Sequence, residues 1–271
     1  MAQRKTPRVL SIAGSDSSGG AGIQADIKTI AMLGGYAMTA ITAVTAQNTV
    51  GVQGIAPMGG DIVFRQIDSC IDDIGVDAVK IGMLHDAEII EAVARGLENV
   101  DAPIVLDPVM IATSGAALIS QDAIALMRER LFSEAALVTP NLPELEHLAG
   151  RTLRSGTQIG EAVEEMAADY GTAILAKGGH TEDARIFDFL AVPGDPLRTF
   201  ESRRIDTPHT HGTGCTLSSA IATLIGHGQP LHHAVELGRQ FVRAAIESAP
   251  GFGEGNGPLG HQAVRSLQSS S

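Results

Sequence analysis

The chain has 271 residues, of which 44% are hydrophobic and 31 are glycine, and its formal net charge is −12. This negative charge and an aromatic content of only 3% argue against nucleic acid as a partner, because phosphate backbones are repelled and few rings are available to stack on bases. No apolar run is long enough for a membrane span or a signal peptide, and Cys70 and Cys215 show neither metal-ligand spacing nor a disulfide framework, so we expect a cytoplasmic protein.

Apolar strands alternate with amphipathic helices along the chain. Strands are expected at residues 9–13, 38–44, 78–81, 104–106, 136–138 and 173–175, with a short extended piece at 51–57. Helices are expected around Ile23, Ile27 and Ile30 and at residues 62–74, 87–97, 121–131, 160–170, 217–225 and 231–248. Residues 186–191 and 202–205, divided by a turn rich in proline and glycine, predict a hairpin at the sheet edge.

This alternation predicts an α/β fold in which a mostly parallel sheet is covered by helices on both faces. No linker divides the chain into two halves, so we expect one domain over residues 1–250. The remaining residues, 251–271, are rich in glycine and serine, and we expect them to form a mobile tail.

Polar and glycine-rich segments follow six of the expected strands. They lie at residues 14–20, 45–48, 82–83, 107–108, 139–144 and 177–180. In open α/β sheets, ligands bind outside the carboxyl ends of the strands. One polar strand end would be ordinary loop chemistry, but six in succession predict a ligand site.

The segment from Asp206 to Thr216 runs directly into an apolar helix. Gly212 and Gly214 flank Thr213, so backbone N–H groups can crowd together where the helix begins and form an anion site. Cys215 falls in the first helical turn, where the same field favours the thiolate over the thiol. The combination indicates transfer of a charged group, above all phosphate. A glycine-rich turn before a packed helix with a small buried cysteine is the alternative for an isolated motif of this kind.

Two familiar phosphate-binding motifs are excluded in the first loop. Gly14 and Gly19 have the glycine spacing of a P-loop, but Gly20 and Ala21 stand where that motif requires Lys and Ser or Thr, and the G-x-G of a dinucleotide fold is missing. The loop is therefore expected to wrap a substrate. Asp26 lies one helical turn past Gly22, so its side chain can point back towards this loop. The alternative is that Asp26 is a solvent-exposed acid on the helix. Gln47 can pair with a pyrimidine ring or cap a turn.

Six segments together resemble hydroxymethylpyrimidine/phosphomethylpyrimidine kinases, which belong to the ribokinase-like family and act in thiamine biosynthesis. The similarity extends from Val9 to Ser248 in order and at family-like spacing. The segments are residues 9–26, 42–49, 80–83, 140–144, 177–180 and 210–216. The first and the last are specific to these kinases, whereas Asn-x-x-Glu and Gly-x-Gly occur across the wider superfamily.

The resemblance implies a single-domain ribokinase-like three-layer α/β/α sandwich, usually a homodimer. It also implies two successive ATP-dependent phosphorylations of 4-amino-5-hydroxymethyl-2-methylpyrimidine, first to the monophosphate and then to the diphosphate. The residues that it assigns to the pyrimidine are Gly14, Asp26, Gln47, Met83 and Val109. Those that it assigns to ATP and Mg²⁺ are Asn141 and Glu144, with Asp107 nearby, and Lys177 would neutralise phosphate charge. Those that it places near the transferred phosphate are Thr210, Gly212, Thr213, Gly214 and Cys215, with Cys215 where sugar kinases carry an aspartate base.

One departure from the family concerns the segment after Asp107. Where the family carries lysine in Met-x-Ala-Lys-Ser-Gly, this chain has Thr113, which cannot supply positive charge to a bound phosphate. Loss of this charge bears on the second phosphorylation more than on the first, because the acceptor of the second is already anionic. Two other functions stay open: a pyridoxal kinase on the same scaffold, and a binding or regulatory protein that keeps the pocket without turnover.

Overall fold

The computed structural model describes residues 6–110, 118–179 and 184–264, and within them a nine-stranded sheet in the order β3-β2-β1-β4-β5-β6-β7-β8-β9. The six strands from β2 to β7 in this order are parallel, and β3, β8 and β9 are antiparallel to their neighbours. The strands are β1 (Arg8–Asp16), β2 (Tyr36–Gln47), β3 (Val52–Pro57), β4 (Ala78–Ile81), β5 (Ile104–Leu106), β6 (Leu137–Val138), β7 (Ala173–Ala176), β8 (Arg185–Ala191) and β9 (Arg198–Arg203).

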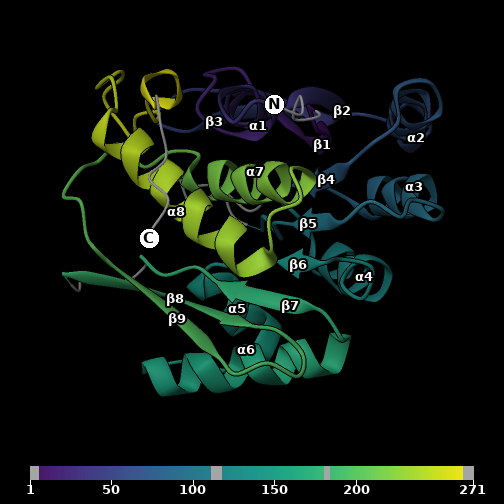
Figure 1. Ribbon diagram of the computed structural model, residues 1–271. Coiled ribbons are helices and arrows are strands. Elements are labelled where there is room, and N and C mark those ends of the chain that lie inside the picture. The colour runs from purple at the N-terminus through teal and green to yellow at the C-terminus, as the bar shows by residue number, and fades with distance from the viewer. Residues whose placement is uncertain (1–5, 111–117, 180–183, 265–271) are drawn as a thin grey trace, which may run out of the picture.

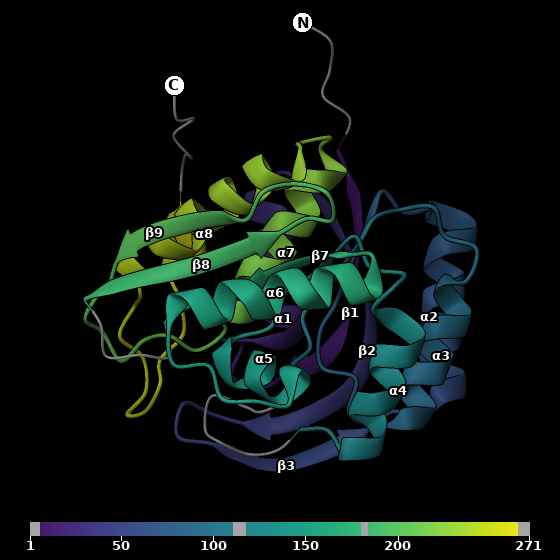
Figure 2. The same cartoon turned by 90° about the horizontal axis from the view of Figure 1, so that it is seen from below.

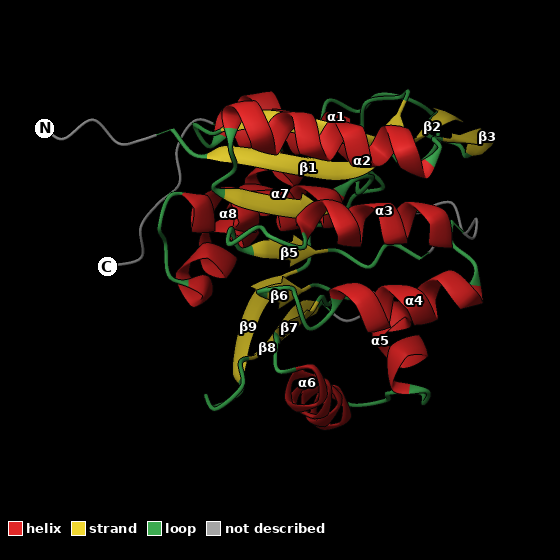
Figure 3. Ribbon diagram, turned by 90° about the vertical axis from the view of Figure 1, so that its right-hand side faces the viewer, coloured by secondary structure: helices red, strands yellow, loops and turns green. Residues whose placement is uncertain are grey.

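Two groups of helices sandwich this sheet (Figures 1 and 3). One face carries α1 (Gly22–Met32), α7 (Thr213–Gly226) and α8 (Leu231–Glu247), whose apolar residues pack on Val9, Val105 and Leu175. The other face carries α2 (Gly60–Ser69), α3 (Ala87–Leu97), α4 (Gln121–Leu131), α5 (Leu142–Ala149) and α6 (Gly156–Tyr170). Because both faces are covered, the central strands β4 and β5 are buried throughout, which explains their almost unbroken apolar sequences. The predicted α/β sandwich is confirmed.

Short polar residues begin several of these helices. Asp86, Ser120 and Ser155 each accept a hydrogen bond from the backbone N–H three residues later, which caps α3, α4 and α6. Among the described residues, no helix combines the length and apolar character needed to cross a bilayer.

Three local predictions differ from the structure. No helix was predicted after the polar segment at 139–144, but α5 begins inside it at Leu142, with Pro143 in the first turn where its missing N–H costs nothing. The expected helix at 62–74 is α2 followed by a short π-helix, Cys70–Ile74. The hairpin at the sheet edge is present, with its second strand earlier than predicted (Figure 2).

The segment expected to be a mobile tail from Gly251 packs against the rest of the domain over residues 255–264. Leu259 and Val264 pack with Phe241 and Ala245 of α8, and residues 261–263 form a 3₁₀ turn. The glycines that suggested mobility lie instead where the backbone passes close to other parts of the domain. This stretch therefore belongs to the domain.

Candidate active site

Asp107 is the centre of a polar cluster at the carboxyl ends of β5, β6 and β7. Its Oδ1 accepts hydrogen bonds from Nζ of Lys177, at 2.5 Å, and from Oγ1 of Thr139, at 3.2 Å. Its Oδ2 lies 3.4 Å from Oγ of Ser218 on α7. Burial alone would lower the pKa of Lys177, but the carboxylates of Asp107 and Glu144 outweigh it and raise that pKa, so Lys177 is a cation.

Glu144 and Asn141 form a reciprocal cap at the start of α5. The Asn141 side chain accepts from the Glu144 N–H at 2.9 Å, and a Glu144 carboxylate oxygen accepts from the Asn141 N–H at 2.8 Å. The other Glu144 oxygen accepts from the Met110 N–H. Burial, reinforced by the negative charge of Asp107 and opposed by Lys177, raises the pKa of Glu144 to about 7. A cation bound near Glu144 would stabilise its charged carboxylate.

The beginning of α7 faces this cluster. Gly212 is the N-cap in the left-handed region, with φ 85°, and no side chain caps this helix end. A Cβ on Gly212 would lie 1.9 Å from the carbonyl oxygen of Gly20. The loop after β1 therefore touches, through backbone, the loop that leads into α7 (residues 206–212, here called the anion loop). A Cβ on Gly214 would lie 3.2 Å from Oδ2 of Asp107 and 3.3 Å from Nζ of Lys177. The positive end of α7 therefore lies close to Asp107 and Lys177.

Cys215 lies in the first turn of α7 and is partly buried. The prediction that its helix position favours the thiolate is wrong for this structure. Burial raises the pKa of the Cys215 thiol to about 11, and the carboxylates of Asp26 and Asp107 add to the rise, while Lys80 and the backbone of Gly22 oppose it. Desolvation outweighs the helix dipole, so Cys215 is a neutral thiol at pH 7.

Three of the predicted pyrimidine residues meet in an apolar wall. A Cβ on Gly14 would lie 2.7 Å from Cε of Met83, so Met83 packs directly over the Gly14 backbone. Met83 clusters with Ala43, and Val109 packs against the same group. The wall is apolar, which suits contact with the face of a ring.

Gln47 ends β2 beside a buried Asp–His pair. Its amide nitrogen lies 3.4 Å from Nε2 of His211, which in turn lies 2.8 Å from Oδ2 of Asp16. Burial alone would raise the pKa of Asp16, but hydrogen bonds from His211, Ser18 and Ala21 lower it, so Asp16 is a carboxylate. It connects the first loop to the anion loop across 195 positions of sequence.

Asp26 lies deeper than the sequence suggested. Its side chain has no exposed surface, and its oxygens lie 2.8 Å from Nζ of Lys80, 2.6 Å from Oγ of Ser11 and 3.0 Å from Oγ of Ser219. Burial alone would lower the pKa of Lys80, but the Asp26 charge raises it above its usual value. This arrangement disfavours direct contact between Asp26 and a ring and makes it a support beneath the site.

Sequence reasoning singled out neither Lys80 nor the pair of Asp16 and His211. Lys80 carried a usable signal, because a single charge in the otherwise apolar strand Ala78–Ile81 requires a buried partner. Asp16 and His211 carried none that sequence spacing can reveal, because they meet only when the two loops come together. Thr113 lies outside the described residues.

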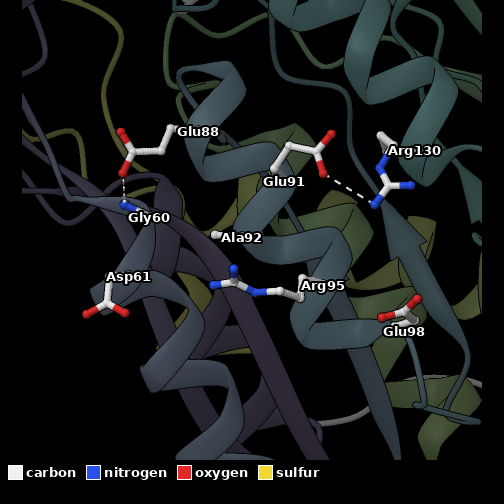
Figure 4. Close-up of a pocket in the computed structure, with 8 residues that line it drawn as sticks. All are labelled: Gly60, Asp61, Glu88, Glu91, Ala92, Arg95, Glu98 and Arg130. Carbon is white, nitrogen blue, oxygen red and sulfur yellow. Dashed lines mark hydrogen bonds and ion pairs between the residues drawn. The ribbon is translucent and has the colours of Figure 1, made fainter.

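A separate surface groove of about 570 Å³ lies between α2, α3 and α4 (Figure 4). It contains no predicted site residue. Most of its charged groups have partners: Glu88 accepts from the Gly60 N–H at 2.6 Å, Glu91 pairs with Arg130 at 3.3 Å, and Arg95 lies over the Phe64 ring. We therefore assign the active site to the sheet edge. No three His, Cys, Asp or Glu side chains of the described ranges group as a metal cage.

Most of the chain is similar to known proteins. The sequence model of the family described as phosphomethylpyrimidine kinase matches residues 16–260. A hydroxymethylpyrimidine/phosphomethylpyrimidine kinase of Bacillus subtilis is 43% identical over 260 residues, which cover 95% of this chain and 96% of that protein. The protein of the same name from Rhizobium meliloti is 44% identical over 259 residues, covering 94% and 97%.

Solved structures give the same fold. The phosphomethylpyrimidine kinase of Clostridium difficile 630 has a TM-score of 0.79 and 37% identity, covering 89% of this chain and 100% of that one. An ADP complex of Bacillus subtilis pyridoxal kinase has a TM-score of 0.87 and 34% identity, covering 96% and 99%.

Proposed function

The chain belongs to the phosphomethylpyrimidine kinase family, and on this premise we propose that it phosphorylates 4-amino-5-hydroxymethyl-2-methylpyrimidine with ATP. The first transfer goes to the hydroxymethyl oxygen and the second to the monophosphate so formed, as thiamine biosynthesis requires. One observation carries the proposal: an uncapped helix end faces the Asp107–Lys177 pair close to the apolar wall. Phosphoryl transfer depends on such positioning and charge neutralisation more than on covalent chemistry.

The pyrimidine lies against Gly14, Met83 and Val109, and the Gln47 amide hydrogen-bonds its polar edge. Gln47 is half-buried, and its backbone N–H donates to Oγ of Ser17 at 2.8 Å, so the residue is held while its side-chain amide remains accessible. Asp26 acts on this pocket from beneath, through Ser11 of β1 and Ser219 of α7.

ATP places its phosphates between α7 and the Asp107 cluster. The N–H groups of Gly212, Thr213, Gly214 and Cys215, together with Lys177, stabilise the negative charge that develops on the transferred group, and Thr210 and Asn141 bind nearby. As the substrate oxygen bonds to the γ-phosphorus, the bond from that phosphorus to the β–γ bridging oxygen breaks, and ADP leaves. The substrate proton passes to Cys215 only if its thiol is first deprotonated.

Mg²⁺ fits the carboxylates of Asp107 and Glu144. Both side chains are buried, Asp107 directly after β5 and Glu144 in the first turn of α5, and burial is the main cause of the raised pKa of Glu144, with the charge of Asp107 adding to it. These two carboxylates would hold the ion, and phosphate groups of the substrates would be its other partners. When bound, it supplies charge neutralisation.

A pyridoxal kinase is the second candidate, because pyridoxal kinases of Bacillus subtilis and Staphylococcus aureus share this fold at a TM-score of 0.87. Purified protein incubated with ATP, Mg²⁺ and one acceptor at a time distinguishes the two activities by ADP release. We expect higher kcat/KM with hydroxymethylpyrimidine than with pyridoxal, and measurable ADP release with the monophosphate. Greater kcat/KM with pyridoxal would overturn the assignment. Thr113 bears on the monophosphate step alone.

A cytoplasmic location and a homodimer are also proposed. The described part of the chain has two free cysteines, which suits a reducing compartment. The dimer rests on the family resemblance, and sedimentation of the purified protein tests it.

A further inference from the structure

Residues 255–264, here called the C-terminal strap, fold back beside the end of α8 and reach the anion loop (yellow in Figure 1). The carbonyl of Gly257 accepts a hydrogen bond from the His211 N–H at 3.1 Å. The N–H of Asn256 donates to the Thr49 carbonyl at 2.9 Å, in the turn that follows Gln47. The strap therefore contacts both the phosphate end and the pyrimidine end of the site.

Three glycines of the strap lie where a side chain would collide. A Cβ on Gly255 would be 2.1 Å from the Thr49 carbonyl oxygen, and one on Gly260 would be 2.0 Å from the Ser248 carbonyl oxygen. On Gly257 it would be 2.2 Å from Nδ1 of His209 and 2.9 Å from the Phe252 carbonyl oxygen. The glycine content thus permits close backbone packing along a fixed path.

The strongest link is between His261 and Thr216. Nε2 of His261 lies 2.8 Å from Oγ1 of Thr216, and both side chains are fully buried. Thr216 directly follows Cys215 in the first turn of α7. Burial lowers the pKa of His261 to about 4, so a neutral imidazole makes this bond at pH 7.

We propose that the strap is a positioning element for the anion site, with His261 as the residue that holds the first turn of α7 in place through Thr216. This inference rests on the proposed function. Backbone donors stabilise a transition state only when they already point at the place where charge develops. The strap holds the backbone donors of the anion site in place at two points. Gly257 restrains the loop before α7, and His261 restrains the helical turn after Gly212.

Four variants test the proposal. Thr216→Val and His261→Asn each remove the buried hydrogen bond, and the first does so with little change of shape. Thr216→Ser keeps the hydroxyl. His227→Asn is the matched control, because Nε2 of His227 makes a 2.9 Å hydrogen bond to the Leu33 carbonyl at the opposite end of the same helix.

We expect kcat with hydroxymethylpyrimidine to fall about tenfold in Thr216→Val and His261→Asn, while KM for both substrates changes less than about twofold, because misplaced donors weaken the transition state more than the ground state. Thr216→Ser should retain more activity than Thr216→Val, and His227→Asn should match wild type. If kcat stays at the wild-type value in the first two variants, or falls equally in His227→Asn, the proposal is wrong.

Hydrogen exchange gives a readout that does not need turnover. In Thr216→Val, the backbone amides of residues 212–217 should exchange faster than in wild type, whereas those of α3 should not change. This measurement stands even if the wild type phosphorylates no pyrimidine, so it separates failure of the strap from failure of the proposed function. Unchanged exchange at residues 212–217 would show that the strap packs over this part of the domain without positioning the first turn of α7. Should His261→Asn not fold, Thr216→Val decides the matter.

Discussion

Lys80 and Asp26 form an ion pair from which water is excluded on both sides, with 2.8 Å between Nζ and Oδ2. The pair joins β4 to α1, and through Ser11 and Ser219 it also reaches β1 and α7. Four elements that carry site residues therefore share one buried carboxylate. Loss of either charge leaves the other uncompensated in a medium of low dielectric constant.

We predict that Lys80→Met lowers the free energy of unfolding by about 3–5 kcal/mol, as is usual when one partner of a buried pair is removed. Urea unfolding measures the change. The double variant Lys80→Met/Asp26→Leu should recover much of the loss, because no charge is then left alone. Arg65→Ala, which breaks an exposed pair with Asp61, should cost less than about 1 kcal/mol. Equal losses in the single and double variants would show that packing, not charge, is responsible.

Gln47→Leu should weaken pyrimidine binding by about 1–3 kcal/mol, since polar ring atoms would lose their partner in a closed pocket. Calorimetric titration with the pyrimidine and with an ATP analogue separates the two sites, and ATP affinity should hardly change. Gln53→Leu on the exposed strand β3 is the control. If both ligands weaken together, misfolding rather than lost recognition is the cause.

The sheet and most of its helices could be predicted from the sequence, because apolar periodicity reports burial directly. Ala78–Ile81, Ala87–Leu97 and Ile104–Leu106 were predicted to the residue. α5 was missed because Asn141 to Glu144 was interpreted only as a ligand motif. The same residues form a capping box with proline in the first turn, which is a helix-start signal.

Only those features of the site that depend on neighbouring residues in the sequence could be predicted. The strand ends and the uncapped helix at Gly212 follow from local pattern, and the structure brings Asp107, Lys177 and Gly214 together. The protonation state of Cys215 depends on burial and on charges from Asp26 and Asp107, which lie far from it in sequence. The glycines after residue 250 indicated mobility because composition cannot distinguish a free chain from one packed against backbone.

Glu144→Gln should lower kcat strongly while pyrimidine binding without ATP stays near wild type, because the glutamine keeps the helix cap but loses the charge. Steady-state assays at saturating Mg²⁺ measure this. Glu146→Gln on the same helix is the control, since that carboxylate accepts from the Leu153 N–H instead. Unchanged turnover would remove Glu144 from the mechanism and leave it as a cap.

If Cys215 accepts the substrate proton, kcat should rise with pH above neutrality, because deprotonation of a thiol with a pKa of about 11 limits the rate. Cys215→Ala should then lower kcat by about 10²–10⁴ and lose this rise, with KM little changed. Cys215→Asp should retain more activity than Cys215→Ala. An alanine variant with wild-type kcat and the same pH profile would assign catalysis to the backbone N–H groups alone.

His261 should make the protein sensitive to mild acid. Its folded-state pKa of about 4 lies below the usual 6.5, so the unfolded chain binds the additional proton between these values. Stability is complete above pH 6.5 and falls as the pH drops towards 4, by up to ~3 kcal/mol from this group. Urea unfolding at pH 7 and pH 4.5 should show a smaller difference for His261→Asn than for wild type. An equal difference would assign the acid sensitivity to other groups.

The contact between Asp16 and His211 has a consequence for the growing polypeptide. The loop after β1 leaves the ribosome early, but its histidine partner and the backbone of Gly212 follow about two hundred residues later. Contacts so distant in sequence form slowly, because a long loop must close before they can contribute. Until then α7 is not packed against Asp16, the Asp26–Lys80 pair and the apolar strands. These charged groups and strands are therefore exposed to other chains. Because synthesis adds about 5–20 residues per second, this exposure lasts for many seconds, and during that interval the exposed apolar strands are prone to aggregation.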